Sequence, residues 1–380
     1  MRIGIIGTGV AGSLLAEGLQ GFDVTAFERV ASGDQAEAGT GLNIGPNALK
    51  ALRLHRAARH AALRAASLPW QRWFIDLADG TRLFDLDLRE VAEEPGIRIR
   101  WSELYRLLRA PVAHCTRNAH ALEALEEDAA GRLVPVFHTP QGLVRDGGFD
   151  LLVGADGRYS RLRALTAGEP PGTLLGVCIW RLLVSDAAGC PYDDYGQWFN
   201  GHARLLSFRV PGGAVYIAGT FPLGVDRQIP EPMKTAAAQR ALYTPSDAPP
   251  CAAVAWMLAQ IDAHAAEIHW ARSATVPVLR HAAQGRALFL GDAAQAMVPT
   301  LGQGATQAVE CGVVAANVLR AGGDAAAVAA ARDARVEFVR QFSMESSDTL
   351  LPPADVVAGT ARKRQPDYMA RLRQLYTEVA

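Results

Sequence analysis

Lysine, cysteine clusters and long apolar runs are all scarce in this chain of 380 residues. No run of about 18 apolar residues is present, so no segment is expected to span a membrane. The five cysteines are widely spaced and include no Cys-x-x-Cys pair, which argues against a disulfide framework and for reduced thiols in a cytoplasmic protein. Clustered histidine and cysteine ligands are lacking as well, so no protein-bound metal is expected.

An excess of charge of one sign is also lacking. The 38 basic and 39 acidic residues give a net charge of -1, so no global field would attract nucleic acid or an anionic membrane. Lysine occurs only at Lys50, Lys234 and Lys363, which leaves nearly all of the positive charge to arginine. The length and a hydrophobic content of 49% indicate a globular protein of about two domains.

The N-terminus begins with an apolar segment, Arg2 to Ile6, that runs into Gly7-Thr8-Gly9-Val10-Ala11-Gly12. A basic residue before an apolar stretch also occurs in secretory signals. The closely spaced glycines favour a different structure, in which a buried strand enters a tight turn and then a helix. This is the Gly-x-Gly-x-x-Gly arrangement of dinucleotide-binding sites, and its alternative is a glycine-rich turn without a ligand.

Each position of this turn has a physical role in the predicted site. Gly7 permits the turn, Gly9 lets a pyrophosphate approach the backbone, and Gly12 lets the helix pack on the strand. Val10 and Ala11 begin the helix, whose unpaired N–H groups and dipole favour the negative pyrophosphate. We therefore predict that all five residues contact a dinucleotide cofactor.

A carboxylate follows the next strand. Val24 to Phe27 is apolar and ends at Glu28, whose side chain can accept hydrogen bonds from a ribose diol and would repel a 2′-phosphate. The site therefore suits the adenosine half of FAD or NAD rather than NADP. Arg29 is expected beside the same half of the cofactor.

Two later segments repeat the pattern of a strand that ends in glycine and aspartate. Phe149 to Val153 leads into Gly154-Ala155-Asp156-Gly157, and Ala287 to Leu290 leads into Gly291-Asp292. Open α/β sheets bind ligands at the carboxyl ends of their strands. The two aspartates therefore indicate a ligand longer than adenosine, which favours FAD.

A third glycine segment lies further on. Pro299-Thr300-Leu301-Gly302-Gln303-Gly304 precedes a run with helical period from Ala305 to Leu319. The glycines would expose backbone N–H groups at the start of this helix. Such a helix start can stabilise negative charge on a reduced flavin ring, by the same physics that binds phosphate.

In this order, the motifs resemble those of the single-component FAD-dependent aromatic hydroxylases, the group that includes p-hydroxybenzoate, salicylate, 6-hydroxynicotinate and urate hydroxylases. The resemblance implies an α/β protein with a discontinuous Rossmann-type FAD-binding domain, a mostly antiparallel substrate-binding sheet and a C-terminal helix. It also implies tightly bound FAD, with NADH or NADPH as a transient electron donor and O2 as co-substrate. In such enzymes the reduced flavin captures O2 as a C4a-hydroperoxide, which hydroxylates an aromatic or heteroaromatic ring.

The resemblance assigns cofactor contacts along the chain. The adenosine end falls to the first glycine turn and Glu28, the middle of FAD to Asp156, and the ribityl chain to Asp292. Gly41-Leu42-Asn43-Ile44-Gly45-Pro46-Asn47 resembles the loop beside the flavin ring, as does the third glycine segment. The predicted contacts near the ring are Gly41, Ile44, Pro299, Gly302, Gln303, Gly304 and Ala305.

Two departures from the family pattern affect the site. The family usually carries an arginine three residues before a leucine that is matched here by Leu104, whereas this chain has Trp101 there and Arg100 one step earlier. We expect Arg100 to make the FAD contact instead. The family's Asp-Ala-Ala-His is Asp292-Ala293-Ala294-Gln295 here, and a glutamine does not titrate near neutrality as a histidine does.

A second layer is predicted between the cofactor motifs. Trp70 to Leu88 alternates apolar and polar residues around Asp79-Gly80, which is a hairpin turn signal. Strand-like runs follow at Leu174 to Val184, Ala203 to Val210 and Ala214 to Phe221. These segments predict a mostly antiparallel sheet that holds the substrate against the flavin.

The resemblance places four side chains at the substrate. Arg204 and Tyr216 are expected on the sheet, with Gln295 and Pro299 opposite. An arginine can pair with a carboxylate or phenolate, and a tyrosine can orient or deprotonate a ring hydroxyl. The alternatives are a solvated charge and a half-buried aromatic side chain, and His202 is a weaker candidate.

These assignments divide the chain into three predicted parts. The FAD-binding domain comprises residues 1–68, 96–168 and 283–325, the substrate-binding domain residues 69–95 and 169–282, and a C-terminal helical segment residues 326–380. In that segment, a helical stripe is expected to pack on the domain junction or on another subunit, so the protein is a monomer or a homodimer. The stripe consists of Tyr368, Leu372, Leu375 and Tyr376.

Two other functions fit the same motifs. A different FAD-dependent oxidoreductase, such as a dehydrogenase or a halogenase, would use the same scaffold. Trp70-Gln71-Arg72-Trp73 does not match the Trp-x-Trp-x-Ile-Pro motif of flavin halogenases. A protein that binds FAD without turnover is the second alternative.

Overall fold

Six strands from distant parts of the chain form the first sheet of the computed structural model, which describes residues 1–31, 40–224 and 228–379. Their order is β18-β19-β12-β1-β2-β8, and all neighbours are parallel except β18 and β19. Ile3, Ile5 and Ile6 are all buried, as expected for a central parallel strand. The strands are β1 (Arg2–Ile6), β2 (Asp23–Phe27), β8 (Thr116–Arg117), β12 (Leu151–Gly154), β18 (His281–Ala282) and β19 (Ala287–Phe289).

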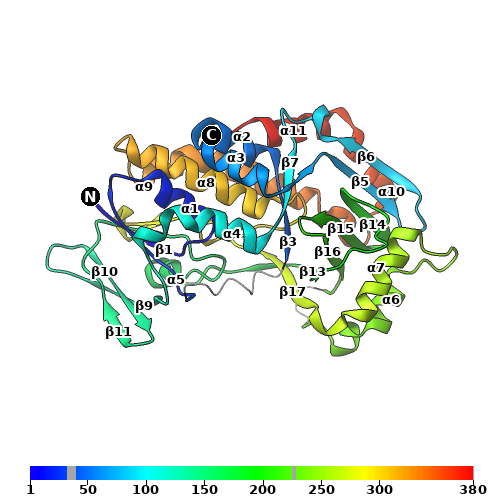
Figure 1. Ribbon diagram of the computed structural model, residues 1–380, viewed down its shortest axis with the longest axis horizontal. Helices are drawn as coiled ribbons and strands as arrows, with labels where there is room; N and C mark the ends of the chain where they lie inside the picture. Colours follow the sequence, from blue (N-terminus) through cyan, green and yellow to red (C-terminus); the bar gives the residue numbers. More distant parts are fainter. Residues whose placement is uncertain (32–39, 225–227, 380) are drawn as a thin grey trace.

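Helices α1 (Val10–Gly18) and α8 (Gln303–Arg320) pack on one face of this sheet and on each other (Figure 1). Their backbones approach closely at Gly312, where a Cβ atom would lie 2.6 Å from the Ala11 carbonyl oxygen. The other face of the sheet packs against a small antiparallel sheet and one helix. These elements are β9 (Ala121–Glu127), β10 (Leu133–Thr139), β11 (Gly142–Arg145) and α5 (Arg161–Ala167).

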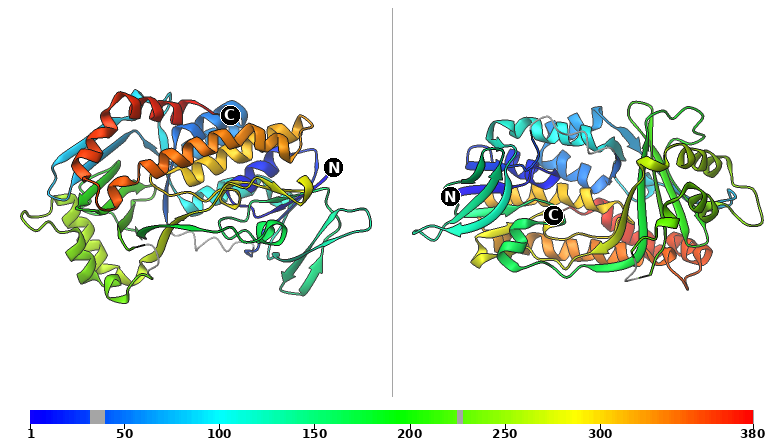
Figure 2. Two further views of the ribbon diagram at one scale, coloured as in Figure 1. Left: turned by 180° about the vertical axis from the view of Figure 1, so that it is seen from behind. Right: turned by 90° about the horizontal axis from the view of Figure 1, so that it is seen from below.

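A seven-stranded sheet forms the second layer, in the order β17-β13-β16-β15-β14-β5-β6. Its neighbours are antiparallel except β14 and β5. Helices α6 (Ala236–Tyr243) and α7 (Ala252–Ala263) cover one face (Figure 2). The strands are β5 (Arg72–Leu77), β6 (Arg82–Asp87), β13 (Thr173–Val184), β14 (Tyr195–Asn200), β15 (Ala203–Val210), β16 (Ala214–Pro222) and β17 (His269–Thr275).

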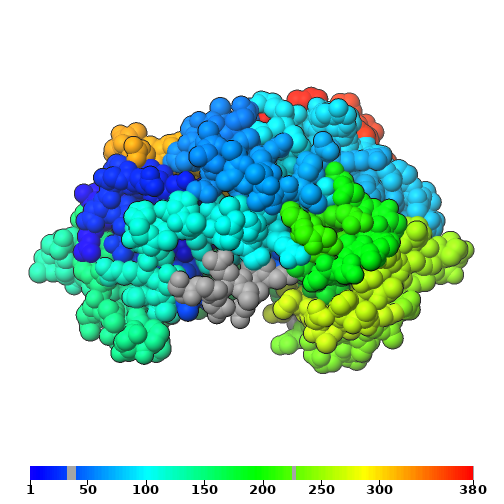
Figure 3. All heavy atoms as spheres, viewed as in Figure 1, coloured from blue at the N-terminus to red at the C-terminus, as the bar shows by residue number. Residues whose placement is uncertain are grey.

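A short antiparallel sheet, β3-β7-β4, lies where the two layers meet. At this junction a Cβ atom on Gly41 would be 2.7 Å from Cβ of Tyr216 in the second sheet. In the space-filling view, the cyan surface of the α4 region lies directly beside the green strands of the second sheet (Figure 3). The elements are β3 (Gly41–Ile44), β4 (Leu68–Trp70), β7 (Gly96–Arg100), α2 (Pro46–His55), α3 (Ala57–Ala65) and α4 (Trp101–Arg109).

The C-terminal segment is more elaborate than the single helix that the sequence predicted. It contains α9 (Ala325–Glu345), α10 (Val356–Ala361) and α11 (Pro366–Thr377). Leu372, Leu375 and Tyr376 of α11 are buried in a cluster with side chains of the second sheet, and the ring of Tyr376 lies 6.2 Å from that of Trp70. These three residues of the predicted stripe therefore pack within their own chain. The sequence had left two possibilities open, packing on the domain junction or on another subunit.

The strands predicted from the sequence are present with small shifts of their ends, and the hairpin turns at Gly80, which has a φ of +97°. Strand β14 and helices α6 and α7 were not predicted. The domain boundaries stay a prediction, and the ranges 1–68 and 169–282 include residues outside those described. Within the described residues, no helix is long and apolar enough to cross a membrane.

Candidate active site

The first glycine turn contains glycines of two kinds. Gly7 has a φ of +95°, and its Cβ atom would lie 2.6 Å from the Ala155 oxygen, while a Cβ on Gly12 would lie 2.0 Å from the Gly7 oxygen. The fold therefore requires glycine at positions 7 and 12 whether or not a ligand binds. Gly9 has an ordinary φ of -69°, and its Cβ atom would meet no described protein atom closer than 3.7 Å. Space beside Gly9 is thus available for a ligand that approaches the backbone.

The Glu28 carboxylate stands beside this turn. Its Oε2 accepts hydrogen bonds from the Thr8 N–H (2.9 Å), the Thr8 hydroxyl (3.0 Å) and Arg109 (3.1 Å), and its Oε1 accepts from the Val30 N–H (3.2 Å). These donors fix the carboxylate of Glu28, a residue that is only 6% exposed, at the carboxyl end of β2. The neighbouring Arg29 is exposed.

Helix α4 presents a polar and aromatic stripe to the same turn. The rings of Trp101 and Tyr105 lie 5.0 Å apart, and the Arg109 guanidinium lies 4.3 Å from the Tyr105 ring. The Tyr105 hydroxyl would be 4.0 Å from a Cβ atom on Gly9. We did not predict Tyr105 or Arg109, although their spacing of four residues along a helix was visible in the sequence.

Arg100, the expected substitute contact, points elsewhere. Its Nε donates to the Pro211 oxygen at 3.1 Å, in the turn between β15 and β16. This bond ties the cofactor layer to the second sheet. The predicted contact of Arg100 with FAD gains no support from it and stays a prediction.

Asp156 lies between the first glycine turn and the start of α5. Its Oδ2 accepts from the N–H groups of Arg161 (2.7 Å) and Leu162 (3.2 Å) at the start of α5, and its Cα would lie 2.8 Å from a Cβ atom on Gly7. Burial raises the pKa of this carboxyl, and the N–H donors oppose the shift. The visible role of Asp156 is therefore to cap a helix, and its cofactor contact stays a prediction.

Asp292, at the end of β19, is placed differently. The side chain has an exposed surface, yet desolvation by the surrounding protein raises its pKa, while the charges of Arg158 and Arg181 lower it. The carboxylate is thus exposed at its surface but has protein close around it, which makes its charged form less well solvated. No hydrogen bond of the carboxylate to a described residue is present, so its oxygens can accept from a ligand.

The two segments that the resemblance assigned to the flavin ring are brought together. Gly302 has a φ of +65°, and its Cβ atom would lie 2.6 Å from Nδ2 of Asn43. The Gly45 N–H donates to the Thr306 hydroxyl at 2.9 Å. The loop after β3 is therefore pinned to the first turn of α8.

The start of α8 also keeps an open side. A Cβ atom on Gly304 would meet no described atom within 4 Å, and Ala305 is partly exposed. Gln303 faces inward and accepts from Asn47 at 3.1 Å, and Ile44 is fully buried. The start of α8 is thus open to a ligand at Gly304.

On the second sheet, Tyr216 faces the junction with Gly41. Burial raises the pKa of the Tyr216 hydroxyl, and the charge of Arg181 opposes this shift. Arg181 also acts on the pKa of Asp292, so its guanidinium lies near groups of both the second sheet and the cofactor layer. We did not predict Arg181, an exposed residue in a largely buried strand.

Arg204 lies on the same face of the sheet and is only 5% exposed. Burial lowers the pKa of its guanidinium, and Tyr195, Tyr243 and Tyr216 are the groups that oppose the shift. Its Nε has no hydrogen-bond partner among the described residues. A buried cation without a counter-ion is costly, so Arg204 is suited to an anionic ligand.

Comparisons with known proteins agree with this geometry. No family model matches the chain. A 3-amino-4-hydroxybenzoate 2-monooxygenase from Streptomyces platensis is 30% identical over 339 residues, which is 84% of this chain and 80% of that protein. An FAD-dependent urate hydroxylase from Klebsiella pneumoniae is 27% identical over 356 residues, 91% of this chain and 88% of that protein. The chain belongs to the FAD-dependent aromatic monooxygenases.

Solved structures show the same fold. The crystal structure of Klebsiella pneumoniae HpxO with FAD and uric acid has a TM-score of 0.78 at 22% identity, and the match covers 98% of this chain and 93% of that one. The structure of 2-methyl-3-hydroxypyridine-5-carboxylic acid oxygenase has a TM-score of 0.73 at 17% identity, and the match covers 100% of this chain and 98% of that one. The predicted fold class, the monooxygenase activity and the cofactor FAD, with NAD(P)H and O2, are confirmed.

In this monooxygenase, the predicted substrate contact of Gln295 gains no support from its surroundings and stays a prediction. Gln295 is 1% exposed, and its Nε2 donates to the Cys311 sulfur at 3.4 Å, so the amide points toward α8. Pro299 is exposed and remains available to the site. Nδ1 of His202 lies 3.2 Å from the Thr349 oxygen, which ties it to the C-terminal segment.

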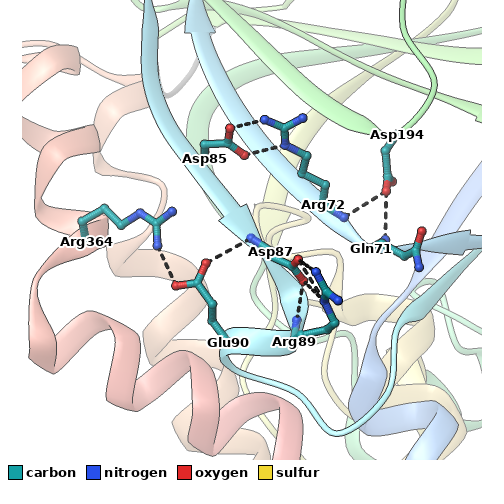
Figure 4. A pocket seen from close by; sticks show the side chains of 8 residues that line it. All are labelled: Gln71, Arg72, Asp85, Asp87, Arg89, Glu90, Asp194 and Arg364. Atoms are coloured by element: carbon teal, nitrogen blue, oxygen red, sulfur yellow. Dashed lines mark hydrogen bonds and ion pairs between the residues drawn. The ribbon is translucent and has the colours of Figure 1, made fainter.

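A surface hollow of about 730 Å³ at β5 and β6 does not suit an aromatic ring (Figure 4). The charged side chains that line the hollow form ion pairs with one another. Arg72 pairs with Asp85, and Arg364 pairs with Glu90 at 3.0 Å. The residues that line it carry no aromatic side chain. They are Gln71, Arg72, Asp85, Asp87, Arg89, Glu90, Asp194 and Arg364.

Proposed function

We propose that this monooxygenase hydroxylates a small aromatic or heteroaromatic compound that binds between the inner face of the second sheet and the flavin loops. The observation that carries the proposal is Arg204, a buried cation whose Nε has no hydrogen-bond partner among the described residues and which lies on the same sheet face as Tyr216. Its guanidinium would pair with an anionic substituent of the ring. The Tyr216 hydroxyl would orient a ring hydroxyl and exchange a proton with it.

The residues of the cofactor layer fit FAD in an extended pose. The absence of a close contact at Gly9 and the open space at Gly304 allow close approach of the pyrophosphate and of the flavin ring. Asp292, whose exposed carboxylate has no hydrogen bond to a described residue, would accept hydrogen bonds from the ribityl hydroxyls. We propose the three-part domain division given above on the same grounds.

When bound, FAD takes electrons from NADH or NADPH and supplies the chemistry that activates O2. The protein orients the ring and stabilises charge. The N-terminus of α8, at Gly302 to Gly304, would stabilise negative charge on the reduced flavin ring through its backbone N–H groups. Tyr216 and Arg181 would contact the substrate from the second sheet.

The test is NAD(P)H oxidation by the purified FAD-loaded protein with a panel of phenols, pyridines and their acids. We expect at least one compound to accelerate the oxidation and to gain one oxygen atom from ¹⁸O-labelled O2. Unlabelled product would point to the dehydrogenase alternative. No acceleration across the panel would contradict the proposal.

Arg204→Gln and Arg181→Gln test the two arginines that we propose at the substrate. Removal of Arg204 should raise KM for an anionic substrate by roughly tenfold or more, because a charge-assisted hydrogen bond is lost. FAD should remain bound in both variants, since neither guanidinium is assigned to the cofactor. Equal KM values in wild type and Arg204→Gln would remove Arg204 from the site.

A further inference from the structure

A second buried cation comes from the C-terminal segment. Lys363 lies just after α10 and is 5% exposed, with its Nζ 5.2 Å from the centre of the Tyr368 ring. The other two lysines of the chain are paired, Lys50 with Glu93 and Lys234 with Glu231. Among the residues that the structure describes, no ion pair or hydrogen bond engages the ammonium group of Lys363.

Lys363 and Arg204 act on each other. Burial lowers the pKa of Lys363 to about 8, Asp348 opposes this shift, and the charge of Arg204 adds to it. Asp348 is partly exposed and already bonded to Arg362. Two like charges thus share a buried region between β15 and the C-terminal helices, and no ion pair with a described residue neutralises either of them.

Polar groups around the two cations have unused hydrogen-bonding capacity. The Thr220 hydroxyl, opposite Arg204 in the strand pair, and the Thr360 hydroxyl are buried and have no partner among the described residues. The hydroxyl oxygen of Tyr195 accepts one hydrogen bond, from Nε2 of Gln197 at 3.1 Å. A structural core would not gather so many unpaired polar groups, since each costs free energy when buried.

The region is connected to the flavin loops. Tyr368 lies 3.1 Å from the Ser346 hydroxyl, and the next residue, Ser347, bonds the Thr300 hydroxyl of the third glycine segment. Leu301 of that segment packs in the same apolar cluster as Tyr195 and Tyr216. Lys363 and Arg204 therefore border the space between the sheet and the loop that carries Pro299.

We propose that Lys363 and Arg204 together bind the carboxylate of an aromatic or heteroaromatic acid, so that the C-terminal segment selects the class of substrate. The inference rests on the proposed function, because it names the substrate of the same site. A carboxylate is charged at neutral pH and offers two oxygens to two cations. A phenol is neutral there and offers one oxygen, which would leave a cation unpaired.

The experiment compares acids with their amides, which have the same shape without the charge. FAD-loaded protein is titrated with benzoate, 4-hydroxybenzoate and nicotinate and with the three matching amides, and binding is followed through the flavin absorbance spectrum. We expect at least one acid to bind roughly tenfold or more tighter than its amide. Lys363→Met should lose most of that preference, while Lys234→Met, a surface control, should keep it.

Thermal unfolding of the ligand-free protein gives a second readout. If Lys363 serves a ligand, Lys363→Met should raise Tm, because a buried charge without a partner is removed. If Lys363 only holds the fold together, the variant should lower Tm and leave the acid preference unchanged, and this result would overturn the inference.

The outcomes also separate this inference from the proposed function. Hydroxylation of neutral rings without any Lys363-dependent preference for acids would overturn the inference and leave the proposed function standing. Lys363-dependent binding of acids without hydroxylation of any ring would support the carboxylate site and contradict the proposed reaction.

Discussion

At the scale of single residues, Gly9 and Gly12 differ in what requires them. A Cβ atom on Gly12 would collide with the Gly7 oxygen at 2.0 Å, whereas one on Gly9 would stay 3.7 Å from the nearest described atom. We expect Gly9→Ala to fold with a loss of about 1 kcal/mol or less and to bind FAD at least about tenfold more weakly. Urea denaturation and FAD titration measure the two effects.

Gly12→Ala is the matched control for this prediction. It should destabilise the protein strongly, because α1 must move away from the turn. A Gly9→Ala protein with the affinity of wild type for FAD would show that no pyrophosphate approaches Gly9.

Lys363 gives a pH-dependent prediction. Its pKa is about 8 in the folded protein against an ordinary 10.5, so between these pH values the unfolded chain holds a proton that the folded chain has lost. The free energy of unfolding should therefore rise from about pH 8 to about pH 10.5, by on the order of 3 kcal/mol. The difference between wild type and Lys363→Met, measured by urea denaturation from pH 7 to 10, isolates this contribution from other groups. A difference in unfolding free energy that stays constant over this pH range would contradict the prediction.

The residues that sequence analysis identified from spacing alone, without the family resemblance, have roles that depend on near neighbours. Gly7, Gly12 and Glu28 act within one strand–turn–helix unit, so their spacing was sufficient. Arg181 and Lys363 gain their roles from groups far away in the chain, Asp292 and Arg204. No local pattern marks such contacts, and the sequence could not have predicted them.

At the scale of elements, helices α8 and α9 are joined by a buried ion network. Glu310 and Arg332 are both fully buried, 2.9 Å apart, and Arg335 lies 3.3 Å from the same carboxylate. Desolvation raises the pKa of Glu310, but the charges of Arg332 and Arg335 outweigh it and hold the pKa below its usual value of 4.5.

We expect Glu310→Gln to destabilise the protein by about 3–5 kcal/mol, because Arg332 would remain buried without its counter-ion. The control Glu337→Gln removes an exposed pair with Arg340 and should cost less than about 1 kcal/mol. Because the folded pKa of Glu310 is depressed, wild-type stability should fall as pH drops below about 4.5, and Glu310→Gln should lose less there. Urea denaturation at pH 7 and pH 4 measures both effects, and equal losses in the two variants would contradict the network's role.

Prediction of elements succeeded where the hydrophobic pattern was regular and bounded by turns. Strands β15 and β16 were predicted almost to the residue. Helix α7 was missed although Val254, Met257, Leu258 and Ile261 repeat at helical spacing, because alanines and Trp256 make its other faces apolar too and obscure the pattern. Strand β14 was missed because it is short, contains Gly196 and Gln197, and is buried on both faces, which gives no alternation.

At the scale of the whole molecule, the cofactor site joins segments that are hundreds of residues apart. The Gly9 turn and Glu28 lie near the N-terminus, whereas Asp292 and the start of α8 lie in the last third of the chain. A ligand that binds only the folded state stabilises it, by about 2.7 kcal/mol at a concentration of 100 times Kd. FAD should therefore raise the Tm of the apoprotein more than ADP does at equal concentration, because ADP reaches only the N-terminal segment.

Asp292→Asn tests the extended pose directly. The variant should weaken the shift of Tm by FAD and leave the shift by ADP unchanged, because the ribityl hydroxyls are absent from ADP. Glu28→Gln should weaken both shifts, since both ligands carry the adenosine ribose. Thermal unfolding of the four combinations separates the two ends of the site. If Asp292→Asn weakened ADP as much as FAD, Asp292 would stand at the adenosine end and the cofactor could not extend along the sheet toward α8.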